Sequence, residues 1–142
     1  MAAVVQQAMP GGNIVVAGMP QAWKASFCGC MSNCSICCYG MCCFSCLYGN
    51  TVSKVRGGGC FEPCLYHACC PLFASCCQAP GLREEIRIKY NLEEAPASDF
   101  IVHCCPCTHA LAVCQEASEL EARGVTAFAP VGGTYALAAP KV

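Results

Sequence analysis

A helical pattern of apolar positions is clearest in two segments of the C-terminal half of the chain. In the first, the run LREEIRIKYNL places Leu82, Ile86 and Tyr90 four residues apart, so that all three share one face of a helix. Glu85 and Lys89 also stand four residues apart, a spacing that lets opposite charges pair along a helix. We expect a short amphipathic helix here.

The second helical segment runs from about residue 110 to residue 123. Val113, Ala117 and Leu120 recur at the i, i+4, i+7 spacing of one helix face. Gly124 follows the segment and supplies a C-terminal stop. We therefore expect a second amphipathic helix in this segment.

The acidic residues of these two segments are expected to face solvent. Glu116 and Glu119 fall outside the apolar stripe of the second segment. Neighbouring acids such as Glu84 and Glu85 point in different directions from a helix, which makes them poor partners for acid–base chemistry. We assign these carboxylates no catalytic role.

Two further stretches, residues 25–53 and 63–82, contain no Asp, Glu, Lys or Arg. As a helix, each is long enough to cross a bilayer of about 30 Å at about 1.5 Å per residue. Gly, Ser and Asn interrupt the first stretch and prolines interrupt the second, so a lipid-exposed helix would leave backbone groups unpaired. We therefore expect attachment to the membrane surface, with S-acylated thiols near residues 41–44 and 72–73, and retain a membrane span as the alternative.

Composition divides the chain into a cysteine-bearing domain between two tails. Residues 1–22 and 125–142 are rich in Ala, Val, Gly and Pro and lack periodicity, so we expect both to be unstructured. All 18 cysteines belong to the domain at residues 23–124. Within it, the glycines at 57–59 and the Glu-Glu-Ala-Pro run at 93–96 are expected breaks between cysteine-bearing pieces.

The charge balance and the cysteine content exclude some partners and locations. With 8 Lys and Arg against 9 Asp and Glu, the chain has a net charge of −1 and no basic stripe, which argues against a nucleic-acid partner. Cysteine at this density usually indicates a disulfide scaffold in a secreted protein. Residues 1–23, however, contain no Lys or Arg and no unbroken apolar run, unlike a signal peptide. Reduced thiols facing the cytosol are therefore expected, as metal ligands, acylation sites or redox groups.

The first cysteine block has the spacing of a metal site. It holds eight cysteines in 19 residues and contains two CxxC units, Cys34/Cys37 and Cys43/Cys46. A CxxC turn lets two thiolates bind one tetrahedral zinc ion at about 2.3 Å, and the ion lowers the pKa of the thiols. We predict a zinc site at these four cysteines. Buried structural thiols and disulfides are the alternative interpretations.

Two later blocks add thiols and histidines. The second block runs from residue 60 to residue 77 and contains His67, and the third is the run HCCPC at residues 103–107. A histidine within a few residues of several thiols is a candidate zinc ligand. We predict a second metal site at His103, Cys104, Cys105 and Cys107.

No catalytic motif accompanies these cysteines. The glycines at 57–59 lack the following Lys and helix start of a phosphate-binding loop. Cys104 beside His103 would need a pocket and an orienting third group to act as a nucleophile pair. A thioredoxin-type CxxC follows a strand and opens a helix, and the pattern shows no such strand. The sequence therefore predicts a non-enzymatic protein.

Taken in order, the motifs resemble one known family. Trp23 is followed by FCGCMSNCSICC, CCFSCLYG, LREEIRIKYNL, Asp99 before HCC, and AVCQEASEL. Over residues 23–124 this order is similar to the placenta-specific-8 family, which includes cornifelin and the plant cadmium-resistance and fruit-weight (cell-number-regulator) proteins. The resemblance implies a small cysteine-rich protein, often at the plasma membrane. Members are linked to heavy-metal tolerance, calcium entry and control of cell number, without an agreed biochemical activity.

Three departures limit this resemblance. Where relatives tend to have CPC or CFPC, this chain has CFSC, which loosens the turn but keeps the metal spacing. Gly29, Ser32 and Asn33 stand where relatives place acids, which removes hard oxygen ligands for calcium and leaves soft-metal binding unaffected. Leu111 stands where relatives often carry a cysteine. A third site would have to be built differently.

These patterns predict a small cysteine-rich domain of mainly short α-helices and irregular loops, stapled by zinc-like ions, with unstructured tails. Metal binding would add folding energy to a small apolar core. The expected function is soft-metal (zinc or cadmium) handling, or metal-dependent regulation of a membrane protein, at the cytosolic side of the plasma membrane rather than outside the cell. The alternatives are a structural subunit whose tails dock on a larger assembly, and an oligomeric membrane pore.

Overall fold

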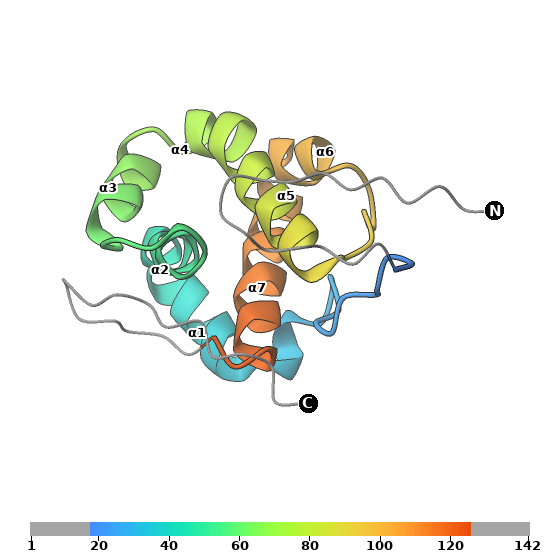
Figure 1. The fold of residues 1–142 in the computed structure, drawn as a ribbon. Coiled ribbons are helices and arrows are strands. Elements are labelled where there is room, and N and C mark those ends of the chain that lie inside the picture. Colours follow the sequence, from blue (N-terminus) through green and yellow to red (C-terminus); the bar gives the residue numbers. More distant parts are fainter. Residues whose placement is uncertain (1–17, 126–142) are drawn as a thin grey trace.

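The longest helix, α7 (Pro106–Ala122), runs through the middle of a bundle of short helices in the computed structural model, which describes residues 18–125 (Figure 1). Its neighbours in space include α1, α2 and α6. In chain order the elements are η1 (Cys30–Ser32), α1 (Cys34–Cys42), α2 (Phe44–Arg56), α3 (Phe61–Cys69), α4 (Pro71–Phe73), η2 (Ala74–Gln78), α5 (Ala79–Tyr90), α6 (Asp99–Cys104) and α7.

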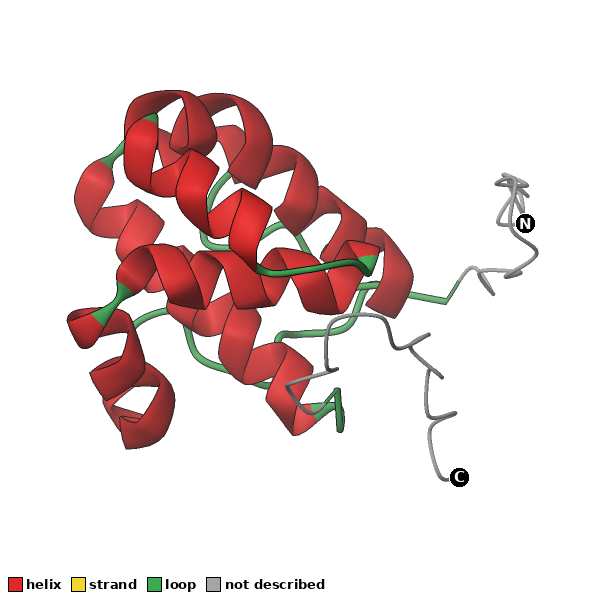
Figure 2. Cartoon of the chain, turned by 90° about the vertical axis from the view of Figure 1, so that its left-hand side faces the viewer, coloured by secondary structure: helices red, strands yellow, loops and turns green. Residues whose placement is uncertain are grey.

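Short loops join these helices, and the described part of the chain contains no strand (Figure 2). A single bridge pairs Gln21 with Leu92, and the backbone N–H of Gln21 donates to the carbonyl oxygen of Asn91 at 2.7 Å. The expectation of a mainly helical domain is confirmed. The predicted tails at 1–22 and 125–142 lie mostly outside the described residues, apart from residues 18–22 and Val125.

Both helices predicted from the apolar pattern are present, and each begins earlier than expected. Helix α5 takes Pro80 into its first turn and ends where Asn91 adopts a left-handed φ of 51°. Helix α7 begins at Pro106 rather than near residue 110. Proline suits the first turn of a helix because its φ is already helical and its missing N–H would have no partner there.

Helices α1, α2 and α3 were not predicted. The apolar positions of α1 are largely cysteine, so the stripe that marks a helix is weak there. Helix α2 does carry such a stripe, formed by Leu47, Tyr48 and Val52, and sequence reasoning missed it. Local signals do remain: the side chain of Asn33 accepts a hydrogen bond from the N–H of Ile36 and caps α1. Gly57, with a φ of 78°, ends α2 and confirms the expected break at 57–59. The break at 93–96 separates α5 from α6.

The apolar core forms where α2, α5 and α7 meet, and both predicted stripes face it. Its fully enclosed members are Leu47, Tyr48, Val52, Ala79, Leu82, Ile86, Leu92, Val113, Ala117 and Leu120. The predicted stripe residue Tyr90 packs against the edge of this cluster. Burial of these side chains holds the three helices together. It thereby also positions the starts of α2 and α7, where Cys43 and Cys105 lie.

The charge-free stretches form several short helices in place of one long one. Residues 25–53 contain η1, α1 and most of α2, while residues 63–82 contain most of α3, then α4, η2 and the start of α5. Among residues 18–125 no helix combines the length and the apolar character needed to cross a membrane.

Candidate functional site

The cysteines of this domain are kept at or near its surface. Sixteen are free thiols, of which none is buried, and all 18 lie within the described residues. Cysteine is among the residue types most often buried in folded proteins. Ten of the free cysteines are exposed and six are half-buried, and among these Cys114 packs against the apolar core. Core packing is therefore not the common role of these residues.

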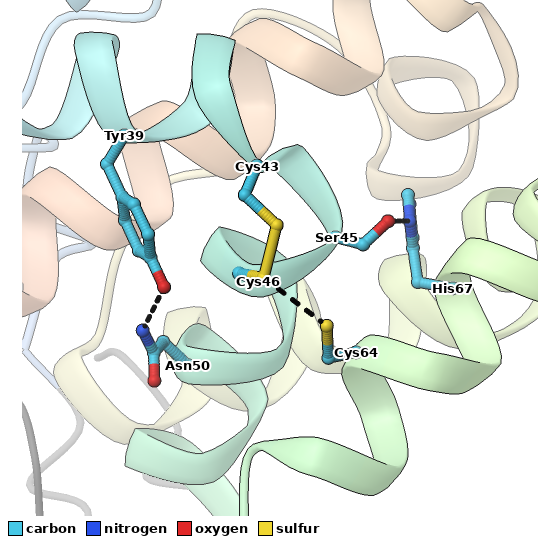
Figure 3. The surroundings of a disulfide bond; sticks show 7 residues. All are labelled: Tyr39, Cys43, Ser45, Cys46, Asn50, Cys64 and His67. Atoms are coloured by element: carbon cyan, nitrogen blue, oxygen red, sulfur yellow. Dashed lines mark hydrogen bonds between the residues drawn. A yellow bond between two sulfur atoms is a disulfide. The ribbon is translucent and has the colours of Figure 1, made fainter.

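The first predicted metal site is split between two helices. Cys34 and Cys37 lie in the first turn of α1, whereas Cys43 caps α2 and forms a disulfide with Cys46 (Figure 3). Among residues 18–125, no three His, Cys, Asp or Glu side chains are arranged to hold one metal ion. Metal binding by these four cysteines stays a prediction for the reduced chain.

A pair of thiols on η1 and α1 has a spacing that suits a soft metal. The thiol of Cys37 donates to Sγ of Cys30 at 4.0 Å. Two sulfurs bound to one tetrahedral zinc ion at about 2.3 Å are about 3.8 Å apart. The pKa of Cys37 is raised by this hydrogen bond and then by burial. Sequence reasoning missed Cys30 because it belongs to neither CxxC unit.

Cys114 of α7 lies beside this pair. Burial raises its pKa to about 11, and the nearby thiols of Cys30 and Cys37 act in the same direction. The raised pKa values of Cys37 and Cys114 keep these two thiols protonated when no metal is present. Metal binding here would therefore release protons.

The second predicted metal site is not assembled. His103 is fully buried on the inner side of α6, whereas Cys105 and Cys107 are exposed at the start of α7. Cys104 shares a hydrogen bond with Cys76, and burial is the largest cause that raises the pKa of Cys104. Because these residues straddle the junction of two helices, their side chains point to different environments.

Cys105 has a different electrostatic environment from the other thiols described above. It caps α7, and the backbone N–H groups of Thr108 and Cys107 lower the pKa of its thiol. The N-terminus of a helix stabilises a thiolate in this way.

A chain of three buried histidines links α3, α6 and α7. The Nε2 atoms of His67 and His109 are 3.2 Å apart, and the Nδ1 atoms of His109 and His103 are 2.8 Å apart. The outer nitrogens of the chain reach Oγ of Ser45 at 3.1 Å and Oε1 of Glu116 at 3.0 Å. Every ring nitrogen of the chain therefore has a polar partner, as buried polar groups require.

Burial controls the protonation of these histidines. It lowers the pKa of His67, and it lowers the pKa of His109 to about 4, with the charges of His103 and His67 adding to the effect on His109. Sequence reasoning treated His67 and His103 as separate ligand candidates. It missed the chain because no local pattern joins these positions, which come together only where α3 and α7 both pack against α2.

The carboxylates expected on a solvated face of α7 are buried, so that expectation is wrong. Glu116 lies 3.1 Å from the Nη1 atom of Arg83, which is itself fully buried. Glu119 accepts hydrogen bonds from the backbone N–H of Ala25 at 2.9 Å and from Nε of Arg123 at 2.6 Å. Glu116 and Glu119 can be buried because each carboxylate accepts hydrogen bonds from donors inside the domain.

Arg83 also attaches the segment before η1 to the helices. Its guanidinium group lies 4.2 Å from the centre of the Trp23 ring and donates to Oε1 of Gln115 at 2.7 Å. Gln115 in turn donates to the carbonyl oxygen of Ala25 at 2.9 Å. The motif residues Trp23 and Gln115 thus belong to one polar network that holds the fold.

Comparison with known proteins identifies relatives across this whole domain. The family model described as the PLAC8 family matches residues 23–119. Relatives include Protein PLANT CADMIUM RESISTANCE 10 of Arabidopsis thaliana, 32% identical over 122 residues that cover 71% of this chain and 62% of the relative. Cell number regulator 5 of Zea mays is 30% identical over 130 residues, 78% of this chain and 70% of the relative. Placenta-specific gene 8 protein of Bos taurus is 30% identical over 104 residues, which cover 72% of this chain and 77% of the relative.

The chain therefore spans less than two thirds of the length of the cadmium-resistance relative. No solved structure matches this chain. The resemblance inferred from the order of the cysteine and helix motifs is confirmed.

Proposed function

The chain belongs to the PLAC8 family, and on this basis we propose that it binds soft metal ions, zinc or cadmium, at the cytosolic face of a membrane. Two relatives in Arabidopsis thaliana carry cadmium resistance in their names. The role we propose is metal handling, or metal-dependent regulation of a membrane protein, by binding rather than by an enzymatic reaction.

The observation that carries this proposal is the accessibility of the thiols. Sixteen cysteines are free and none of them is buried. Thiolates are soft ligands that favour zinc and similar ions over calcium and magnesium. A domain that keeps this many sulfur atoms accessible has the chemistry to capture cadmium or zinc.

The pair of Cys30 and Cys37 is the first binding position we propose. A metal ion there would replace the proton of the hydrogen bond between the two sulfurs, which are already 4.0 Å apart. Cys114, whose pKa the thiols of Cys30 and Cys37 help to raise, is the third sulfur we propose for this site. The three sulfurs would have to rearrange around an ion, because they are not arranged to hold one in the described structure.

Apolar side chains beside the thiols support attachment to a membrane surface. Phe61 and Leu65 of α3 and Leu72 and Phe73 of α4 are all exposed, and the two helices pack against each other. Exposed cysteines flank these residues along the chain, among them Cys60, Cys69 and Cys70. Apolar contacts of this kind, together with acylation of a neighbouring thiol, give a reversible membrane attachment.

A growth assay in cadmium-sensitive cells tests this function. We expect the full-length chain to raise the cadmium concentration that the cells tolerate and to sediment with their membranes. The double variant Cys30→Ser, Cys37→Ser should lose tolerance but keep its membrane attachment. The matched variant Cys28→Ser, Cys77→Ser, which changes two exposed thiols outside both proposed sites, should keep tolerance and attachment. Equal tolerance with and without the expressed chain would overturn the proposal.

A further inference from the structure

Three cysteine sulfurs meet where α2 begins. Cys43 and Cys46 form a disulfide in the first turn of α2, and the thiol of Cys64 on α3 donates to Sγ of Cys46 at 3.6 Å (Figure 3). In the view of Figure 3, Cys64 approaches Cys46 from the side away from Cys43. A free thiol thus touches one sulfur of an existing disulfide.

The contact depends on a glycine that lets α3 approach α2. A Cβ atom placed at Gly49 would come within 2.5 Å of the carbonyl oxygen of Cys60 and within 2.8 Å of Cβ of Cys64. Only a residue without a side chain leaves this space. A hydrogen bond of 3.1 Å between Ser45 of α2 and His67 of α3 joins the same two helices. Contacts between α2 and α3 therefore lie both before Cys64, at Cys60, and after it, at His67.

We propose that Cys43, Cys46 and Cys64 form a thiol–disulfide exchange site. The thiolate of Cys64 attacks Sγ of Cys46, so that a Cys46–Cys64 bond forms and the Cys43–Cys46 bond breaks. Cys43 leaves as a thiolate and takes up the proton that Cys64 gave to solvent. The step moves no net electrons and needs no outside oxidant, and it is reversible by the same path.

The start of α2 favours Cys43 as the sulfur that leaves. Cys43 is the N-cap of this 13-residue helix, and a helix N-terminus stabilises a thiolate. The sequence argument against redox chemistry required a strand before the CxxC unit. The chemistry itself requires only the helix start, which the junction of α1 and α2 supplies here.

The exchange changes which helices are covalently joined. In one form the disulfide lies within the first turn of α2, and in the other it would connect α2 to α3 and leave Cys43 as a free thiol. Small-molecule thiols and their disulfides, such as glutathione, are the class of reactant that would open or reform the bond. The inference stands independently of the proposed metal binding, because it concerns sulfur connectivity alone.

Peptide mapping can distinguish the two forms. Cys43 and Cys46 fall on one tryptic peptide, whereas Lys54 and Arg56 separate them from Cys64. The full-length chain is equilibrated with reduced and oxidised glutathione in a chelating buffer, quenched with acid and alkylated. The two peptides contain eight and six cysteines, so tandem mass spectrometry fragments the joined pair and assigns the link to Cys46 and Cys64.

We expect this joined pair in the unmodified chain and as the main disulfide of Cys43→Ser. In Cys64→Ser we expect about tenfold less of it, because no other thiol touches Cys46 in the described contacts. Cys60→Ser is the matched control, since Cys60 lies one turn away on the same helix face and should leave the yield unchanged. Circular dichroism confirms that each variant folds, and Cys64→Ala replaces a serine variant that does not.

Two outcomes would overturn the inference. One is the absence of a Cys46–Cys64 link in Cys43→Ser under conditions in which the unmodified chain forms its Cys43–Cys46 disulfide. The other is an equal loss of the joined pair in Cys60→Ser and Cys64→Ser. Because chelator is present throughout, neither outcome bears on metal binding, and failure of the cadmium assays leaves this test unchanged.

Discussion

The Nη1 atom of Arg83 lies 3.1 Å from Oε1 of Glu116, and neither side chain is accessible to solvent. Residues 33 positions apart thus place opposite charges inside the domain, where His103 also binds the same carboxylate oxygen at 3.0 Å. Because a lone buried charge is costly, each member of this pair stabilises the fold only while the other is present.

Substitution of Arg83 is expected to destabilise the domain strongly. Arg83→Met leaves Glu116 without its cationic partner and removes the contact over Trp23, so we expect a loss of about 3–5 kcal/mol in the free energy of unfolding. Urea denaturation followed by circular dichroism measures it. Arg56→Met is the control: its partner Glu85 is half exposed, and such surface pairs contribute at most about 1 kcal/mol. Equal losses in the two variants would show that the buried pair has no special role.

Stability should fall in mild acid because of the histidine chain. The pKa of His109 is lowered to about 4 from its usual 6.5, so between these values the unfolded chain binds more protons than the folded chain. The free energy of unfolding therefore has its highest value above about pH 7. It decreases as pH falls toward 4, by on the order of 2–3 kcal/mol.

The groups that face His109 come from several helices. They are the rings of Phe44 and Tyr48 on α2, His67 on α3, His103 on α6 and Glu116 on α7 itself. Urea denaturation between pH 7.5 and 4.5 gives the slope. His109→Asn should flatten it, and an unchanged slope in this variant would assign the acid sensitivity to other groups.

The strongly periodic parts of the fold could be predicted from sequence. Leu82 and Ile86 on α5 and Val113 and Leu120 on α7 are large apolar residues at helix spacing, and they face the core as expected. The break after α2 could also be predicted, because the glycines at 57–59 interrupt a helix through their own backbone freedom. The order of short motifs was sufficient to indicate the family.

The rest depended on tertiary contacts. Helix α1 presents cysteine where a typical helix presents Leu or Ile, which leaves little periodicity to detect. The stripe of Leu47, Tyr48 and Val52 on α2 was detectable but lies among the cysteines that drew the metal interpretation. Glu116 and Glu119 look like solvent-facing residues until Arg83, Arg123 and the backbone of Ala25 supply their donors. The two predicted zinc sites rested on spacing along the chain. In the structure the first is divided between α1 and the Cys43–Cys46 disulfide of α2, the second lies across the junction of α6 and α7, and metal binding at both stays a prediction.

Gly49 should tolerate no side chain. A Cβ atom there would lie 2.5 Å from the carbonyl oxygen of Cys60, a backbone atom that cannot move freely. We expect Gly49→Ala to cost about 1–3 kcal/mol of stability and to lower the yield of the Cys46–Cys64 link. Gly59→Ala meets nothing within 4 Å and should be neutral or slightly stabilising. A thermal melt in which both variants match the unmodified chain would contradict the close packing of α2 and α3.

Cys105 and Cys114 should differ sharply in reactivity. Backbone N–H groups lower the pKa of the exposed Cys105, whereas burial raises the pKa of Cys114 to about 11. Since the thiolate is the reactive form, iodoacetamide at pH 7 should label Cys105 at least about tenfold faster. Time-resolved alkylation of the reduced chain, read by peptide mass spectrometry, gives both rates. Labelling at similar rates would refute the assigned environments.

Titration of the reduced, metal-free chain with cadmium tests the central claim most directly. The absorbance of sulfur-to-cadmium charge transfer reports each thiolate that binds. We predict saturable binding of at least about one cadmium ion per chain. The double variant Cys30→Ser, Cys37→Ser should bind its first ion about tenfold more weakly than the matched double variant Cys69→Ser, Cys70→Ser. Absence of a charge-transfer band, or identical curves for the two double variants, would contradict the account.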